Sequence, residues 1–120
     1  MYLNIRSLEK NFDELQTYLV SLSNKPLFIA ITETWLLNSS NTNKFNLTGY
    51  HPIIVKNRGI KRGGGLGIYL KSSLNFEEIA FDDNYDFEYL AVNVFSSGTT
   101  FTIHVIYNPP NNNKLFFEPI

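Results

Sequence analysis

The sequence contains no cysteine, so neither disulfide bonds nor thiolate metal sites can stabilise its fold. It also lacks a long hydrophobic run. The longest one, residues 26–31, is much shorter than the roughly 20 residues that cross a membrane as a helix. The first residues show no basic patch followed by an apolar segment, the mark of a secretory signal. We therefore expect an intracellular protein with no membrane partner.

Charged side chains are few, and their signs balance. They make up 18% of the 120 residues, and the formal net charge is −1. The molecule as a whole therefore exerts no strong attraction on nucleic acid, and any such binding must depend on a local basic patch. Apolar residues make up 43%, and the chain has 10 Phe and 7 Tyr. This composition predicts a globular, strand-rich chain that forms one compact domain or part of a larger one.

The beginning of the chain has the pattern of a strand, a helix and a second strand. A short apolar run ends at Asn4, and a helix is predicted next because apolar residues recur at spacings of three or four: Leu8, Phe12, Leu15, Leu19 and Leu22. Asn11 and Glu14 resemble a capping box near the start of this helix. Residues 26–31 are continuously apolar, which is typical of a strand buried on both faces. In such a βαβ unit the two strands are parallel.

The rest of the sequence predicts further strands separated by turns. We expect strands at residues 51–55, 66–71, 75–80, 87–95 and 100–107. The last two would form a hairpin through residues 96–99, where Ser96, Ser97 and Gly98 favour a turn. Together with the βαβ unit, this pattern predicts the α/β fold class.

Two polar residues lie where chemistry is expected in a sheet with parallel strands. Asn4 ends the first strand, and Glu33 directly follows the second. Functional residues gather beyond the carboxyl ends of parallel strands, so an amide oxygen and a carboxylate would converge here. One or two protein oxygens with several waters are what Mg²⁺ prefers. The alternative is that Glu33 caps the next segment and Asn4 closes a turn.

Five short motifs follow one another at plausible spacing between Asn4 and Pro110. They are Asn4-Ile5-Arg6-Ser7-Leu8 with Lys10, Ile31-Thr32-Glu33-Thr34-Trp35-Leu36, Gly49-Tyr50, Arg62-Gly63-Gly64-Gly65-Leu66-Gly67-Ile68-Tyr69, and Val105-Ile106-Tyr107-Asn108-Pro109-Pro110. In this order they resemble the apurinic-endonuclease-type domain of non-LTR retrotransposon polyproteins, within the endonuclease/exonuclease/phosphatase superfamily. The resemblance implies the N-terminal part of a four-layer α/β sandwich, with two mixed sheets between outer helices.

The resemblance also implies roles for three residues. Asn4 and Glu33 would hold Mg²⁺ (or Mn²⁺), and the hydroxyl of Tyr107 would contact the scissile phosphate. The parent activity would be Mg²⁺-dependent nicking of DNA, which leaves a 3′-hydroxyl for the reverse transcriptase of the same polyprotein. DNA would be the partner, and the nucleus the place of that activity.

Other parts of the family's pattern are not found in this sequence. Similar enzymes use a later Gly-Asp-x-Asn segment and a final Ser-Asp-His, but no Asp follows Asp86, and the only histidines are His51 and His104. His104 is interpreted as structural, and Asn108 replaces the arginine that usually follows the tyrosine. Because in-line hydrolysis needs an activated water as well as a metal, we predict a partial domain over residues 1–120 that is inactive alone.

Two charged stretches and a glycine run allow more than one interpretation. Lys56, Arg58, Lys61 and Arg62 would form either a DNA-contacting edge or a solvated loop. The glycines of residues 63–67 fit neither a dinucleotide nor a phosphate-loop pattern, so we interpret them as a tight entry into a strand. The acidic residues between 77 and 88 could offer paired carboxylates for catalysis, but their loop-like setting favours a solvated stretch, and we interpret them so. The alternative functions are a non-catalytic nucleic-acid-binding remnant and a phosphatase-type member of the same superfamily.

Overall fold

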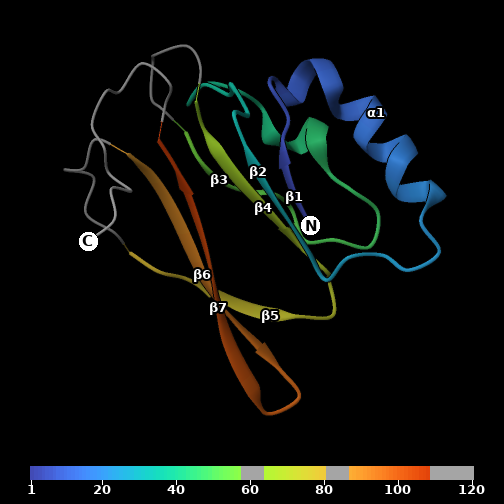
Figure 1. Ribbon diagram of the computed structural model, residues 1–120, viewed down its shortest axis with the longest axis vertical. Helices are drawn as coiled ribbons and strands as arrows, with labels where there is room; N and C mark the ends of the chain where they lie inside the picture. The colour runs from blue at the N-terminus through green and yellow to red at the C-terminus, as the bar shows by residue number, and fades with distance from the viewer. Residues whose placement is uncertain (58–63, 81–86, 109–120) are drawn as a thin grey trace.

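The computed structural model describes residues 1–57, 64–80 and 87–108, which form a helix layer and two β-sheets (Figure 1). Helix α1 is Leu8–Ser21, and a short 3-10 helix, η1, is Thr42–Phe45. The first sheet has the order β1 (Tyr2–Asn4), β2 (Phe28–Thr32), β4 (Leu66–Leu70) and β3 (Ile54–Lys56). The second has the order β5 (Asn75–Glu78), β6 (Glu88–Ser96) and β7 (Thr99–Tyr107).

The predicted βαβ unit is confirmed. β1 and β2 are adjacent and parallel, with Asn4 opposite Thr32 in the register. Helix α1 connects them and buries Leu8, Phe12, Leu15 and Leu19 against the first sheet. Each fully buried side chain of this kind contributes about 1.5–3 kcal/mol relative to an exposed one. The helix therefore holds β1 onto β2 and fixes the ends of both strands.

The start of α1 differs from the prediction. The helix begins at Leu8, and Ser7 is its N-cap, with Oγ accepting a hydrogen bond from the backbone N–H of Lys10 at 3.1 Å. Asn11 lies inside the helix, and its Nδ2 donates to the carbonyls of Ile5 at 2.8 Å and Arg6 at 3.1 Å. The capping box predicted at Asn11 is therefore wrong. Its side chain instead stabilises the turn that leads from β1 into the helix.

The central strands of the first sheet are buried on both faces, which explains their continuous apolar sequence. In β2, Ile29 and Ile31 belong to the core beneath α1, whereas Ala30 belongs to the core between the sheets. In β4, Tyr69 faces the helix side, and Leu66, Ile68 and Leu70 face the second sheet. From that sheet Leu90, Val92, Val94, Ile103 and Val105 complete the inner core.

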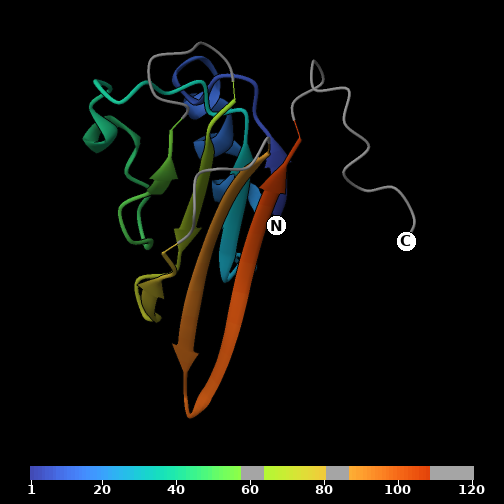
Figure 2. The same cartoon turned by 90° about the vertical axis from the view of Figure 1, so that its left-hand side faces the viewer.

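The second sheet is dominated by the long β6–β7 hairpin, which projects beyond the first sheet (Figure 2). The predicted turn is confirmed: Ser96 pairs with Thr99, and the two residues between them have positive φ, 47° at Ser97 and 81° at Gly98. A two-residue loop of this kind matches the twist of the flanking strands. The other strands lie near their expected positions, except that β3 begins at Ile54 and not at residue 51.

The α/β fold class is confirmed, with two sheets packed face to face and α1 on the outer face of the first. The first sheet is mixed, since β1–β2 is parallel and the other pairs are antiparallel, whereas the second is antiparallel throughout. Within the described residues, neither helix has the length and apolar character that crossing a membrane requires.

Candidate active site

Asn4 and Glu33 meet at the carboxyl ends of β1 and β2, as predicted. Because the strands are parallel and in register, the last residue of β1 lies beside the residue that follows β2. The Nδ2 of Asn4 donates a hydrogen bond to Oε2 of Glu33 at 2.5 Å. Asn4 is exposed and Glu33 is half-buried, so both side chains are open to a ligand. The hydrogen bond uses Nδ2 of Asn4 and one carboxylate oxygen of Glu33, so the amide oxygen of Asn4 takes no part in it.

The loop that carries Glu33 is held by backbone hydrogen bonds on the side of α1. Glu33 has φ 56°, a conformation that non-glycine residues rarely adopt and that costs about 1–3 kcal/mol. Its carbonyl accepts a hydrogen bond from Ser7 N–H at 2.9 Å, and the carbonyl of Thr34 accepts one from Leu8 N–H, also at 2.9 Å. The N–H groups of Ser7 and Leu8 lie at the start of α1 and have no acceptor within the helix. By binding these two carbonyls instead, they stabilise the strained loop.

The other side of the loop is held by the glycines that precede β4. Thr34 N–H donates to the carbonyl of Gly65 at 3.2 Å, and Trp35 N–H donates to that of Gly64 at 2.8 Å. Gly65 has φ 93°, and a Cβ there would collide with Oγ1 of Thr34. The interpretation of the glycines as a tight strand entry is therefore confirmed for Gly64 and Gly65.

Glu88 connects the loop of Glu33 to the second sheet. The interpretation of the acidic residues as a solvated stretch is therefore wrong for Glu88. Its Oε1 accepts a hydrogen bond from the buried N–H of Gly65 at 2.7 Å. The side chain is half-buried between the sheets, whereas Glu77 and Glu78 on β5 are exposed as expected. Asp82, Asp83 and Asp86 lie outside the described residues. No local signal distinguishes Glu88 from the other acidic residues, because its partner is 23 residues away in the sequence.

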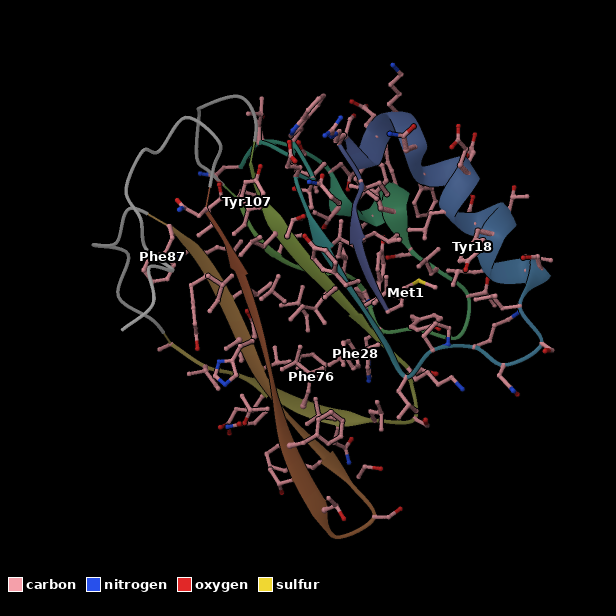
Figure 3. All side chains as sticks on the ribbon, viewed as in Figure 1. Met1, Tyr18, Phe28, Phe76, Phe87 and Tyr107 are labelled. Carbon is pink, nitrogen blue, oxygen red and sulfur yellow. The ribbon has the colours of Figure 1, made fainter. Side chains whose placement is uncertain are left out.

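Tyr107 reaches the same site from the end of β7 (Figure 3). It lies opposite Glu88 in the β6–β7 register, and its hydroxyl donates a hydrogen bond to the carboxylate of Glu33. The pKa of Tyr107 is raised to about 12, first by burial and then by the hydrogen bond to Glu33 and the negative charges of Glu33 and Glu88. At neutral pH the hydroxyl is therefore protonated and acts as a hydrogen-bond donor.

The residues at the site fit a hard cation with an open coordination shell. Asn4 and Glu33 offer amide and carboxylate oxygens at the ends of adjacent strands. Among the described residues, no three His, Cys, Asp or Glu side chains cluster to form a dedicated metal cage. One or two protein oxygens, with water and phosphate oxygens in the other positions, is the usual environment of Mg²⁺. It would not suit a structural zinc ion, which takes four nitrogen or sulfur ligands.

The predicted basic patch is described only in part. Lys56 is half-buried at the end of β3, where it pairs with Leu66 at the start of β4. Arg58, Lys61 and Arg62 lie outside the described residues, so their role in nucleic-acid binding stays a prediction.

The two histidines do not join the site. His51 packs against Phe76, and its Nε2 is 2.6 Å from the carbonyl of Leu74. His104 is on the face of β7 opposite to Tyr107, exposed and hydrogen-bonded to the hydroxyl of Tyr89. The structure thus brings together Asn4, Glu33 and Tyr107, and adds Glu88 to them.

Comparison with known proteins shows a shared fold. No protein-family model and no curated protein matches the chain. Among solved structures, it is similar to a variant of the 3′ phosphatase NExo from Neisseria bound to a product DNA hairpin, with a TM-score of 0.52 and 18% sequence identity. The match covers 88% of this chain and 38% of that one. Over most of its length the chain therefore has the fold of one part of that phosphatase.

Proposed function

We propose that this chain forms the metal- and phosphate-binding part of a Mg²⁺-dependent DNA-nicking domain of the endonuclease/exonuclease/phosphatase superfamily. The observation that carries the proposal is the contact between Asn4, Glu33 and Tyr107, three residues from separate parts of the chain. They meet at the edge of a sheet where ligands of α/β folds bind. The fold shared with a phosphatase that was solved with a DNA product supports the same class of substrate.

Each residue has a distinct task in this proposal. Glu33 and Asn4 would hold Mg²⁺ (or Mn²⁺), which neutralises the charge that develops on the phosphate and on the leaving oxygen. Tyr107 would give its hydrogen bond to a non-bridging phosphate oxygen, in place of Glu33. Because its pKa is raised to about 12, Tyr107 serves as a donor and not as a base or a nucleophile.

The set of catalytic residues proposed for this chain is incomplete. The aspartate and histidine that activate water and contact the phosphate in similar enzymes are not found in the 120 residues. We therefore propose that these residues bind metal and DNA but nick DNA little when they are alone. In the intact parent, a retrotransposon polyprotein acting in the nucleus, the reverse transcriptase would extend the 3′-hydroxyl that the nick creates.

A second candidate function is removal of a 3′-phosphate from DNA. The specific observation in its favour is that the similar solved structure is a 3′ phosphatase. The same metal and the same tyrosine would bind a terminal phosphate. A third candidate, a non-catalytic DNA-binding remnant, depends on Lys56 and the three basic residues that follow it. It would be excluded if the salt dependence of DNA binding stayed unchanged when all four became Ser.

The proposal is tested by measuring Mg²⁺ affinity, duplex DNA binding, plasmid nicking and 3′-phosphate release on the whole chain. The variant is Glu33→Gln, and the matched control is Glu77→Gln, an exposed glutamate on β5. We expect Glu33→Gln to weaken Mg²⁺ binding by at least about tenfold, whereas the control leaves it unchanged. Equal Mg²⁺ affinity of wild type and Glu33→Gln would contradict the proposed metal site. Phosphate release without nicking would favour the second candidate.

A further inference from the structure

Trp35 is the chain's one tryptophan, and it is exposed next to the candidate site. Its relative exposure is 46%, whereas its neighbours Thr34 and Leu36 have only 1% and 4%. Thr34 and Leu36 therefore point into the protein, and Glu33 and Trp35 point out of it. Single exposed apolar side chains are common on protein surfaces, so exposure alone would not indicate a function.

The backbone of Trp35 provides a second, independent observation. Its φ is 56°, which is unusual for a bulky residue and costs free energy. Leu36 N–H donates to Oγ1 of the buried Thr34 at 3.3 Å, and the carbonyls of Gly64 and Gly65 hold the amides of Trp35 and Thr34. The backbone of Trp35 is thus held in this conformation by the hydrogen bonds of the loop. Strain of this kind in an exposed aromatic residue is typical of a ligand-binding position.

The spacing between Trp35 and Glu33, the proposed metal ligand, is comparable to the size of one nucleotide. Residues two apart in a chain have Cα atoms at most about 7 Å from each other. A phosphate held between Glu33 and Tyr107 would therefore leave the sugar and base of an adjoining nucleotide within reach of the indole. An indole has no charge with which to bind a phosphate, but its wide, flat face is suited to stack on a base.

We infer that Trp35 stacks on a nucleobase next to the phosphate bound by Asn4, Glu33 and Tyr107, and that it selects DNA in which this base is unpaired or at a strand end. The inference rests on the proposed binding of DNA at this site. A base within a continuous duplex already stacks on its neighbours, so only an unstacked base offers its face to Trp35. The contact tolerates any base, because every base has such a face.

The test uses Trp35 as its own probe, since no other tryptophan contributes to the fluorescence. The whole chain is titrated with oligo(dT) and with an abasic deoxyribose-phosphate strand of equal length, and binding is followed separately by anisotropy of a label on the strand. We expect oligo(dT) to quench Trp35 emission and the abasic strand to bind without quenching it. Trp35→Ala should weaken oligo(dT) binding by roughly five- to a hundredfold and leave abasic binding unchanged.

Two further variants keep the test decisive. Trp35→Phe retains an aromatic face and should preserve most of the oligo(dT) affinity, whereas Phe95→Ala removes an exposed aromatic residue near the tip of the β6–β7 hairpin and should have no effect. Binding of oligo(dT) that neither quenches Trp35 nor responds to Trp35→Ala would overturn the inference alone. Absence of binding to both strands in wild type would overturn it together with the proposed DNA binding.

Discussion

Glu88 accepts a hydrogen bond from the backbone N–H of Gly65 at 2.7 Å, and this contact joins the second sheet to the loop that carries Glu33. Gly65 in turn accepts from Thr34, the residue after Glu33. Glu88 also lies opposite Tyr107 in the register of β6 and β7. Glu88 therefore holds the loop of Glu33 through its side chain and lies beside Tyr107 through the pairing of β6 with β7.

Replacing Glu88 tests this connection. Glu88→Ala leaves the buried N–H of Gly65 without its acceptor, and the loss of a hydrogen bond to a charged group should lower the free energy of unfolding by about 1.5–3 kcal/mol. Glu88→Gln retains an acceptor oxygen and should cost less. Urea unfolding gives the stabilities, and amide exchange at Thr34 and Trp35 should accelerate in Glu88→Ala. If Glu88→Ala behaves like the exposed control Glu77→Ala, the carboxylate does not hold the loop.

Position 65 requires glycine for two separate reasons. Its φ is positive, and a Cβ at this position would collide with Thr34. Gly65→Ala should destabilise the fold by roughly 3 kcal/mol or more, because it combines positive φ with a collision at Oγ1 of Thr34. Gly98→Ala is the matched control: it has a similar φ, 81°, but nothing lies within 4 Å of its added Cβ. It should cost about 1 kcal/mol. Equal losses in thermal or urea unfolding would mean that the contact with Thr34 contributes nothing.

The sequence predicted those parts of the fold that depend on local patterns. The continuous apolar run of β2 and the spacing of apolar residues in α1 predicted a parallel pair of strands, and this pairing placed Asn4 beside Glu33. The turn at Ser97 and Gly98 was predictable because serine and glycine are common turn residues, and glycine adopts positive φ without steric cost. Each of these features depends on residues that are close together in the sequence, or on the rule that the two strands of a βαβ unit are parallel.

Features that depend on contacts between distant segments could not be predicted in this way. Ser7 caps α1 because the chain turns sharply out of β1, with positive φ at Arg6 and Ser7, and this turn depends on the loop after β2. Glu88 looked like one more exposed acidic residue, since nothing near it in the sequence indicates a partner in the other sheet. The contact of Tyr107 with Glu33 likewise requires the packing of one sheet on the other.

The titration of Tyr107 reports directly on Glu33. Burial is the main cause of the raised pKa of Tyr107, and the hydrogen bond and charge of Glu33 add to it, so Glu33→Gln should lower this pKa below about 12 but leave it above 10. Phenolate absorbance gives the value when the titration of Tyr107→Phe is subtracted. A raised tyrosine pKa stabilises the folded state below pH 10 and loses that effect as the pH rises from 10 through 12. A pKa that stays unchanged in Glu33→Gln would mean that burial alone causes the shift.

Asn4→Asp tests whether the site prefers a cation. The change replaces a hydrogen-bond donor to Glu33 by a second carboxylate, so two negative charges meet at the ends of β1 and β2. Without divalent ions at neutral pH, the free energy of unfolding should fall by about 1 kcal/mol, because Asn4 is exposed and water screens the repulsion. Mg²⁺ should restore much of this loss, because an ion that binds only the folded state stabilises it. Thermal unfolding with and without Mg²⁺ is the measurement.

The control for this prediction is Asn75→Asp, the same chemical change at an exposed position of β5. It should alter stability by no more than about 0.5 kcal/mol and should show no special response to Mg²⁺. The increase in Tm with Mg²⁺ should therefore be largest in Asn4→Asp, smaller in wild type and absent in Glu33→Gln. Should Mg²⁺ raise the Tm of Asn4→Asp no more than that of Asn75→Asp, the two carboxylates do not share a cation. The Asn4–Glu33 contact would then be a structural hydrogen bond that closes the end of the parallel strand pair.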